Sequence, residues 1–495
     1  MNAVVDPAIR HADFRAAPQP ERVRAVVEQL RKVLPAHAVL HRDEDKRPYE
    51  CDALSAFRQM PLAVVLPDTE AQVIAVLKAC RDLDVPVVAR GAGTSLSGGS
   101  MPHASGVVLS LARFNRILEL DPYARTAKVQ PGVRNLAISE AAAPHGLYYA
   151  PDPSSQIACS IGGNIAENSG GVHCLKYGLT VHNVLRLRVI TIDGEVLEIG
   201  SAALDSPGLD LLALLIGSEG MLAVVTEITV KLLPRPQLAR AVLASFDDIV
   251  KAGDAVAAII AEGIIPAGME MMDRKTTAAV EPFVRAGYDL SAEAILIVES
   301  DGTPEEVEEE IARIDAVLQR CGCTAQRVSQ NEAERLAFWS GRKNAFPAAG
   351  RISPDYYCMD GTIPRKMLGR MLQAINEMER KYQLGCMNVF HAGDGNLHPL
   401  ILFDANDPDS WHRAELFGAE ILELCVEYGG TVTGEHGIGV EKLSSMCVQF
   451  SPEELKAFFA VKTAFDSQGL LNPGKGVPTL ARCAEYGKMH VHRGQ

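Results

Sequence analysis

The sequence predicts an α+β protein with a helical N-terminal segment, two compact regions and a C-terminal segment. Three observations support this class. Short β-type runs alternate with amphipathic helices along most of the chain. The segment KLLPRPQ, residues 231–237, carries two prolines one residue apart, as at a boundary between domains. The composition, 47% hydrophobic and 22% charged over 495 residues, is that of an ordinary globular protein.

The N-terminal half is predicted to form a helical lead-in and then a compact α/β region. Residues 1–55 are the lead-in, because apolar residues recur at helical spacing in PERVRAVVEQLRKVL. The compact region covers 56–237, with a helix over 69–83 that opens after a proline. Its expected strands are 62–66, 85–89, 106–111, 117–121, 127–129, 185–191, 196–199 and 222–230.

The second region, 238–450, has longer strands and helices, and the segment 451–495 follows it. We expect strands over 239–244, 266–271, 294–299 and 355–363, and helices over 246–262, 304–319 and 364–382. A last helix, 452–464, leads into the loop GLLNPGKG, 469–476.

Charge and cysteine content exclude several classes of protein. A net charge of −14 argues against general binding to nucleic acid or to an anionic membrane. None of the eleven cysteines forms a C-x-x-C pair, so no iron–sulfur or zinc-ribbon spacing is present, and we expect reduced thiols. The polar N-terminus does not resemble an export signal, and no stretch is apolar enough to span a bilayer. We expect a cytoplasmic protein.

Two glycine-rich segments in the first region point to a cofactor. The loop RGAGTSLSGG, 90–99, follows a predicted strand and can turn successive N–H groups toward one anion such as a pyrophosphate. It lacks the dinucleotide fingerprint, since Leu96 stands where that pattern needs glycine. The segment SIGGNIAENSGG, 160–171, is preceded by PDPSS and would let a flat ring lie against bare backbone. The alternative is that both segments are ordinary glycine-rich turns. The presence of two such segments in one region favours the cofactor site.

These motifs, with GSEGMLAVVTE at 217–227 and LNPGK at 471–475, resemble the FAD-binding elements of the vanillyl-alcohol oxidase and p-cresol methylhydroxylase flavoprotein superfamily. The resemblance covers nearly the whole chain. It implies a two-part FAD-binding domain of the p-cresol methylhydroxylase type at 56–237, an α+β cap domain at 238–450 that holds substrate, and a C-terminal segment that returns to the FAD domain. Covalent members attach FAD to a histidine in the first loop, where this chain has Thr94 and Ser95, so we expect non-covalent FAD. The residues that the resemblance places along the cofactor are Arg90, Gly91, Gly93, Thr94, Ser95, Pro151, Asp152, Ser160, Gly162, Gly163, Asn164, Val225 and Asn472.

A histidine-rich pattern in the second region predicts a metal site. In HAGDGNLH, an Asp-Gly turn between two β-type runs folds His391 and His398 toward each other. The motif TGEHG supplies Glu435 and His436 between glycines. Two histidines and one carboxylate leave open positions on a divalent ion such as Zn, Mn or Fe, as in a catalytic site. The alternative is that these histidines only form hydrogen bonds in loops.

The oxidation of a 2-hydroxy acid to a 2-oxo acid would use these groups. A metal on His391, His398 and Glu435 would lower the pKa of the substrate hydroxyl, and His436 would accept its proton while the Cα hydride leaves to flavin N5. Arg342 is the candidate anchor for the substrate carboxylate, although a solvated helix arginine is the alternative. The resemblance to metal-dependent D-2-hydroxyacid dehydrogenases implies the same assignment.

Further resemblances narrow the substrate and the partners. Phe346, Cys358 and Leu400 stand where relatives that oxidise hydroxy-dicarboxylates have polar residues, so we expect glycolate or D-lactate, with glyoxylate or pyruvate as product. Segments 351–364, 388–406 and 482–492 resemble the D-subunit family of bacterial glycolate oxidases, which implies a second flavin-binding subunit and an iron–sulfur subunit. The chain ends nineteen residues after Gly476 without a cluster motif, so its electrons are expected to leave through another protein or a soluble carrier. A stand-alone D-lactate dehydrogenase and a flavin-binding assembly subunit are the alternatives.

Overall fold

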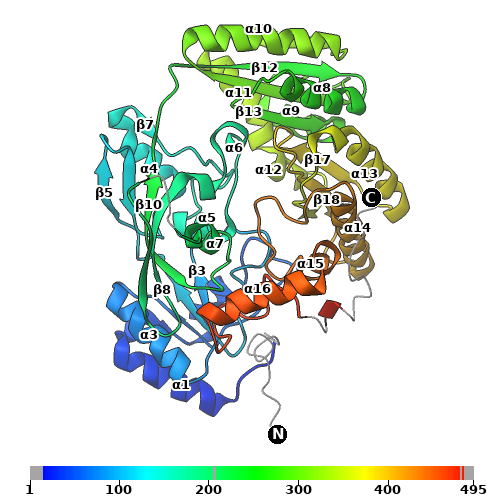
Figure 1. The fold of residues 1–495 in the computed structure, drawn as a ribbon. Helices are drawn as coiled ribbons and strands as arrows, with labels where there is room; N and C mark the ends of the chain where they lie inside the picture. Colours follow the sequence, from blue (N-terminus) through cyan, green and yellow to red (C-terminus); the bar gives the residue numbers. More distant parts are fainter. Residues whose placement is uncertain (1–14, 204–207, 480–481, 484–495) are drawn as a thin grey trace. The chain divides into compact units, whose positions relative to one another are not determined.

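The computed structural model describes residues 15–203, 208–479 and 482–483, which form two compact units (Figure 1). Of the described residues, the first unit contains those up to Ser169, then Leu179–Pro234 and those from His436 to Cys483. The second unit contains Gly170–Gly178 and Arg235–Glu435. The first 14 residues of the expected lead-in and the end of the expected C-terminal segment, 484–495, lie outside the described residues.

The first unit begins with two helices and a small sheet whose strand order is β1-β2-β4-β3. Strand β4 pairs in parallel with both β2 and β3, so the chain must cross over through helix α3. Thr69 caps α3 by accepting a hydrogen bond from the backbone of Gln72, as its position before the apolar periodicity predicts. The elements are α1 (Pro20–Val33), β1 (Val39–Leu40), α2 (Asp43–Lys46), β2 (Ala63–Val65), α3 (Glu70–Asp82), β3 (Val87–Arg90) and β4 (Val107–Ser110).

An antiparallel sheet of order β5-β6-β10-β8-β9 completes the first unit. Buried and half-buried residues alternate along β10, as expected for a strand with one face on the core. Ile161 and Ile165 of α5 join that core. The elements are β5 (Ile117–Asp121), β6 (Thr126–Val129), α4 (Asn135–Ala142), β7 (Leu147–Tyr148), α5 (Ile161–Glu167), β8 (Val184–Ile190), β9 (Val196–Gly200), α7 (Leu211–Leu215), β10 (Val224–Lys231) and β11 (Leu233–Pro234).

The C-terminal segment packs on the small sheet of the first unit. Helices α15 (Leu443–Gln449) and α16 (Pro452–Phe465) precede a loop in which Leu471 forms a bridge to Val87 of β3. Cys447 forms a disulfide with Cys483, so the expectation of reduced thiols is wrong for this pair. Their separation of 36 residues gives no local signal, whereas folding brings their Cα atoms to 5.4 Å.

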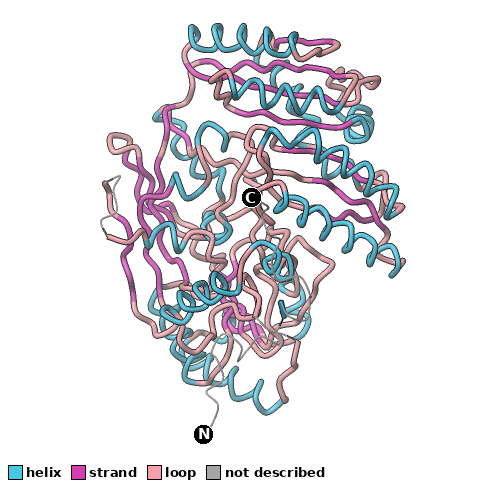
Figure 2. Tube along the Cα trace, turned by 45° about the vertical axis from the view of Figure 1, so that its right-hand side comes forward, coloured by secondary structure: helices cyan, strands magenta, loops and turns pink. Residues whose placement is uncertain are grey.

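The second unit is a seven-stranded antiparallel sheet of order β15-β12-β14-β13-β17-β18-β16 with helices on both faces (Figure 2). Helices α8, α10, α13 and α14 pack on one another in one layer, and α9, α11 and α12 form the other layer. The elements are α6 (Cys174–Tyr177), β12 (Leu238–Phe246), α8 (Ile249–Ala261), β13 (Gly268–Asp273), α9 (Arg274–Val284), β14 (Ala294–Gly302), α10 (Pro304–Arg320), β15 (Ala325–Val328), α11 (Glu332–Lys343), α12 (Ala345–Ala349), β16 (Asp355–Cys358), α13 (Leu368–Tyr382), β17 (Cys386–Phe390), β18 (Pro399–Phe403) and α14 (Pro408–Glu427).

The observed boundaries differ in part from the expected ones. The expected division at 237/238 lies three residues after the division between Pro234 and Arg235. The chain returns to the first unit at His436, whereas a separate C-terminal segment was expected only from 451. The strand expected over 355–363 ends at Cys358, because the next residues turn so that the buried carboxylate of Asp360 accepts backbone hydrogen bonds from the 434–435 segment.

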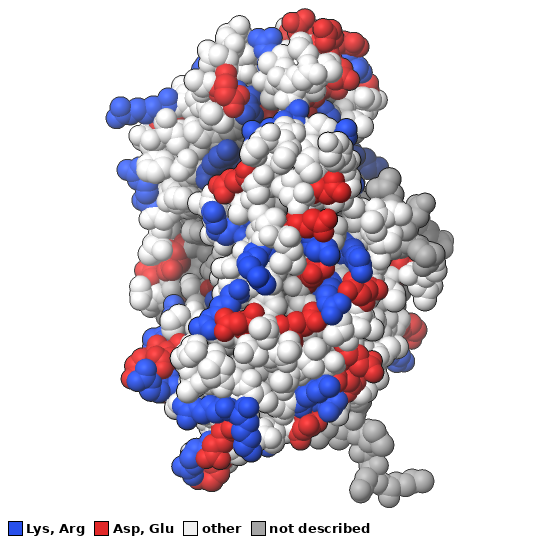
Figure 3. Space-filling model, turned by 90° about the vertical axis from the view of Figure 1, so that its left-hand side faces the viewer, with Lys and Arg blue, Asp and Glu red and all other residues white. Residues whose placement is uncertain are grey.

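No helix in the described part of the chain is long and apolar enough to cross a membrane. On the face shown in Figure 3, acidic and basic side chains are interspersed rather than gathered by sign. The excess of negative charge therefore does not form a single acidic surface on this face.

Candidate active site

The expected histidine hairpin connects β17 and β18, toward the β16 edge of the second unit's sheet. Strand β17 ends just before His391 and β18 begins just after His398, and the two imidazole rings lie 5.0 Å apart between centroids. The turn requires Gly395, whose φ is +81° and whose added Cβ would stand 2.1 Å from the carbonyl oxygen of Ile363. The tight turn therefore directs both rings to one side.

Glu435 completes a group of three potential metal ligands with these histidines. Its Oε1 lies 2.9 Å from Nε2 of His398 and 3.3 Å from Nε2 of His391, and the three atoms lie within 4.8 Å of one another. Asp360 holds the loop in place, because its Oδ1 accepts a hydrogen bond of 3.1 Å from the Glu435 N–H. We call His391, His398 and Glu435 the ligand trio.

A buried carboxylate fixes one member of the trio. Glu270, on β13, accepts a hydrogen bond of 2.5 Å at Oε1 from Nδ1 of His391 and another at Oε2 from Nε of Arg342. The Nη2 atom of Arg342 lies 3.4 Å from Nε2 of His391. Arg342 is only 2% exposed, so it is not a solvated helix arginine. One edge of its guanidinium is bound to Glu270, and the Nη edge faces the trio.

Burial and charge shift the pKa values around the trio in opposite directions. Burial opposes protonation of His391, but Glu270 and Glu435 outweigh it and raise the pKa of His391 well above its ordinary value. Burial also opposes ionisation of Glu435, but the two histidines hold its pKa well below the ordinary range. Burial raises the pKa of Asp394 to about 6. Glu435 is thus held in its ionised form, which is the form that binds cations.

The donor set fits a divalent metal ion. Two imidazole nitrogens and one carboxylate oxygen converge, and the Nδ1 atom of His391 is occupied by Glu270, which leaves Nε2 for a metal. Such carboxylate–histidine pairs orient metal ligands in many proteins. Three protein ligands leave room for a substrate on the same ion.

The two glycine-rich segments of the first unit lie against each other. The N–H of Ala92 donates to Oγ of Ser160 at 3.2 Å, and a Cβ at Gly91 would stand 2.2 Å from the same oxygen. Gly162 packs on Pro131, where an added Cβ would lie 2.9 Å from the carbonyl oxygen. A Cβ at Gly163 would meet only Oγ of Ser160, at 3.4 Å. Gly163 therefore presents bare backbone beside the first loop.

A buried cation next to this loop fits the phosphates of a dinucleotide. Arg90 is 7% exposed and its burial lowers the pKa of its guanidinium. Among the described residues its guanidinium forms no ion pair and donates one long hydrogen bond, 3.4 Å, to Ser100. It also lies over the ring of Tyr49 and beside Gly93, whose φ is +72°. A buried guanidinium with so few partners suits a bound anion.

Several residues expected along the cofactor use their side chains within the protein. Asn164 accepts from Asn135 at 3.1 Å, and Asn135 also donates to the carbonyl oxygen of Pro151 at 3.1 Å. Asn472, with φ +44°, donates to the carbonyl oxygen of Gly99 at 3.0 Å. These residues hold the loops in position. The remaining expected positions, Thr94, Asp152 and Val225, are half-buried.

His436 belongs to the first unit, directly after Glu435 in the chain. Its backbone carbonyl accepts a hydrogen bond of 3.4 Å from Oγ of Ser95, a residue of the first glycine loop. The backbone of the predicted base is thus hydrogen-bonded to the loop that is predicted to bind the cofactor.

Sequence reasoning missed Glu270, Asp360, Glu167 and Glu219. A glutamate inside the apolar strand GMEMMD was the available signal for Glu270, since an unpaired charge is rarely fully buried. Glu167 and Glu219 lie within glycine-rich motifs, in which the glycines alone indicated function. Nothing local marks Asp360, because its partners lie more than 70 residues away.

Comparisons with known proteins identify the class. The profile described as FAD binding domain matches residues 61–200, and FAD linked oxidases, C-terminal domain, matches residues 235–476. The solved structure of p-cresol methylhydroxylase with substrate bound has a TM-score of 0.77 at 18% identity, covering 93% of this chain and 98% of that one. The protein is therefore an FAD-linked oxidase with the p-cresol methylhydroxylase fold.

Two curated relatives narrow the family. Glycolate oxidase subunit GlcD of Escherichia coli strain K12 is 62% identical over 479 residues, which cover 97% of this chain and 96% of the relative. D-lactate dehydrogenase of Archaeoglobus fulgidus is 32% identical, covering 84% of this chain and 91% of the relative. The chain belongs to the family of glycolate oxidase GlcD subunits. The resemblance seen in the sequence motifs is confirmed.

Proposed function

We propose that this protein oxidises glycolate to glyoxylate, and D-lactate to pyruvate, with FAD and a divalent metal ion held by the ligand trio. The convergence of His391, His398 and Glu435, with Nδ1 of His391 held by Glu270, carries the proposal. The names of the two relatives support glycolate and D-lactate as substrates. The set of donor atoms supports a bound divalent metal ion.

The chain's own residues would divide the work. The Nη edge of Arg342 would hold the substrate carboxylate through paired hydrogen bonds. A neutral His436 would take the hydroxyl proton at a ring nitrogen, because an imidazole titrates near physiological pH. Glu435 and His436 are joined by a peptide bond, so their Cα atoms lie about 3.8 Å apart. His436 is therefore next in the chain to a residue that would hold the metal ion.

The cofactor and the metal would supply two kinds of chemistry. FAD accepts the hydride of the substrate Cα, and a divalent ion lowers the pKa of a bound hydroxyl. Arg90 would pair with the pyrophosphate, and the backbone at Gly91 and Gly163 would lie along the flavin. The absence of a histidine at Thr94 and Ser95 supports dissociable FAD.

The environment of the trio favours a short substrate. The ring of Phe346 lies edge-on to His398, with 6.5 Å between centroids, and Cys358 pairs with Leu400 across neighbouring strands. None of these side chains can pair with a second carboxylate, so a dicarboxylate would lose the hydration of one charge without compensation. Glycolate and D-lactate carry only one carboxylate.

The electrons would pass on to partner proteins. The word subunit in the name of the E. coli relative supports assembly with other chains. We propose a second flavin-binding subunit and an iron–sulfur subunit as those partners, since the eleven cysteines here contain no C-x-x-C pair. The complex would work in the cytoplasm, reaching the inner membrane through the partners.

Anaerobic mixing of the purified, metal-loaded chain with hydroxy acids tests the proposal. Glycolate and D-lactate should bleach the flavin in a single turnover without partner proteins, and a four-carbon hydroxy-dicarboxylate should not. Bleaching by D-lactate alone would favour a stand-alone D-lactate dehydrogenase. If no 2-hydroxy acid bleaches the flavin, the chain is an assembly subunit and the proposed chemistry is wrong.

A further inference from the structure

A carboxyl group is enclosed between two glycine-containing segments of the first unit. Glu167, the last residue of α5, lies between Gly99 of the first glycine loop and Gly437, which follows His436. A Cβ at Gly99 would stand 2.6 Å from Oε1 of Glu167, and a Cβ at Gly437 would stand 1.9 Å from Oε2. Only glycine leaves room for the carboxyl group at these positions.

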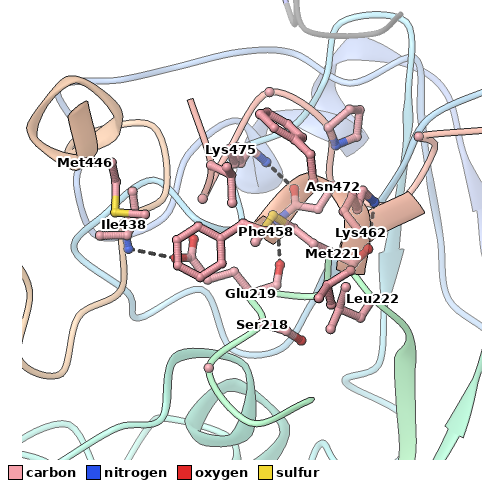
Figure 4. A pocket seen from close by; sticks show the side chains of 18 of the residues that line it. Ser218, Glu219, Met221, Leu222, Ile438, Met446, Phe458, Lys462, Asn472 and Lys475 are labelled. Atoms are coloured by element: carbon pink, nitrogen blue, oxygen red, sulfur yellow. Dashed lines mark hydrogen bonds between the residues drawn. The ribbon is translucent and has the colours of Figure 1, made fainter. Parts of the chain in front are cut away.

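A second carboxyl group lies beside it. Glu219 accepts hydrogen bonds of 2.7 Å from the N–H groups of both Ile438 and Gly439, and Figure 4 shows the first of them. The same hypothetical Cβ at Gly437 would be 3.2 Å from Oε1 of Glu219, so this oxygen lies within about 5 Å of Oε2 of Glu167. We call Glu167 and Glu219 the carboxyl pair.

The partners of the two carboxyl groups differ. Oε2 of Glu167 is shielded from solvent and has no hydrogen-bond partner among the described residues, and Oε1 receives only a long bond, 3.4 Å, from Ser95. Glu219 has two strong backbone donors. An ionised Glu167 would thus be a buried charge with a single long hydrogen bond, beside a second carboxyl group.

Other charged groups face the pair without pairing with Glu167. Lys442 donates to the carbonyl oxygen of Gly437 at 3.0 Å and lies 3.6 Å from Glu441, and Lys475 donates to Asn472 at 2.6 Å. The remaining groups that face this region are Asp52, Arg90, Ser95 and His436. Burial, followed by the charges of Glu219 and Asp52, raises the pKa of Glu167 well above its ordinary value, and Lys442 opposes this shift only in part.

We propose that Glu167 and Glu219 share one proton, and that this protonated pair positions the 437–439 loop and thereby His436. With the proton present, Glu167 carries no charge beside Glu219, and Glu219 keeps its negative charge for the two backbone N–H groups. Without the proton, two adjacent carboxylates repel each other at the point where the loop is held. The inference rests on the proposed role of His436, but its structural part can be tested without that role.

The sign of the effect follows from the raised pKa. A group whose folded-state pKa is raised contributes stability below its unfolded pKa, and this contribution is lost as the pH rises through the folded-state pKa. The loop should therefore be held below the folded-state pKa of Glu167 and released as the pH rises through it, and the rate of flavin reduction should fall over the same range.

Two variants distinguish the effect of the shared proton from the effect of side-chain size. Glu167→Gln keeps the size of the side chain and cannot ionise. Glu219→Gln removes the charged acceptor of the two backbone N–H groups. Glu119→Gln, an exposed position on β5, is the control for loss of one negative charge. Hydrogen exchange of the peptide containing Ile438 and Gly439, corrected for the intrinsic effect of pH, is measured beside the pH profile of flavin reduction.

The wild type and Glu119→Gln should lose protection of this peptide as the pH rises through the folded-state pKa of Glu167, with a parallel loss of flavin reduction. Glu167→Gln should keep protection and move the alkaline limb up by about one pH unit or more. Glu219→Gln should lower protection and reduction about tenfold at every pH, the usual scale for a lost charged hydrogen bond. A Glu167→Gln protein with the wild-type pH dependence of exchange would overturn the shared proton. If hydrogen exchange changes as predicted but flavin reduction does not, the shared proton is supported and the proposed role of His436 is contradicted.

Discussion

The two regions that carry function use their sequence motifs in different ways. In the second unit, the proposed chemistry lies in side chains, and the ligand atoms of His391, His398 and Glu435 converge. In the first unit, the glycine motifs act through backbone, and side chains such as those of Asn164 and Asn472 hold the loops by hydrogen bonds within the protein. A histidine-rich motif thus indicates which side chains are candidates for the site. A glycine-rich motif indicates only where the backbone is accessible to a ligand.

Metal removal tests the side-chain region with the largest expected effect. Chelation should abolish flavin reduction by glycolate, because the hydroxyl then keeps its ordinary pKa, while the FAD spectrum of the unmixed protein stays unchanged. Stopped-flow absorbance before and after addition of Zn, Mn or Fe measures the loss and its recovery. Full activity in protein shown by elemental analysis to be metal-free would contradict the metal site.

His436→Ala should lower the rate of flavin reduction by about a thousandfold, within the usual range for a general base. The protein should stay yellow, because the contact with Ser95 through the backbone carbonyl of residue 436 is kept in the variant. His412→Ala is the matched control, since His412 is exposed on α14. Near-normal reduction in the first variant would remove His436 from the mechanism.

Glu270→Gln tests the support of the trio. The neutral amide lacks the negative charge with which Glu270 binds Nδ1 of His391 and the guanidinium of Arg342. The affinity of the trio for a metal ion should therefore fall about 10- to 100-fold. Competition with a chromogenic chelator measures this affinity. An unchanged affinity would show that Glu270 serves folding rather than metal binding.

Arg342→Lys should raise the KM for glycolate about tenfold, because lysine cannot offer two parallel N–H groups to a carboxylate. The lysine keeps a positive charge beside Glu270, which limits the loss of stability. Steady-state kinetics with an artificial electron acceptor gives the KM. If the KM is unchanged, the substrate carboxylate is bound elsewhere.

Gly163→Ala should give the smallest effect and tests the backbone region. The protein itself leaves room for the added Cβ, so the melting temperature of the FAD-free protein should not change. A bound flavin would meet the new methyl group, and the Kd for FAD should rise about tenfold. An FAD affinity equal to that of the wild type would show that the flavin does not approach this backbone.

The sequence predicted strands and helices well where hydrophobic periodicity was strong. The expected helix 304–319 is α10 (Pro304–Arg320), and the expected strand 117–121 is β5. Helix α14 (Pro408–Glu427) was not expected, and the strand expected over 355–363 was too long. In that strand a buried aspartate that serves a distant loop overrides local β propensity.

The same limit applies to the site. The spacing of His391 and His398 around an Asp-Gly turn indicated their approach, and Glu435 was recognised from its motif. Glu270 and Asp360 were missed, because they act through contacts with residues more than 70 positions away. Periodicity and local spacing cannot reveal such contacts, whereas the folded structure shows them directly.

Anomalous X-ray diffraction from crystals of the metal-loaded protein tests the central claim most directly. We predict one strong peak about 2.0–2.2 Å from Nε2 of His391, Nε2 of His398 and a carboxylate oxygen of Glu435. A fully loaded, active protein whose metal binds at other residues would contradict the account.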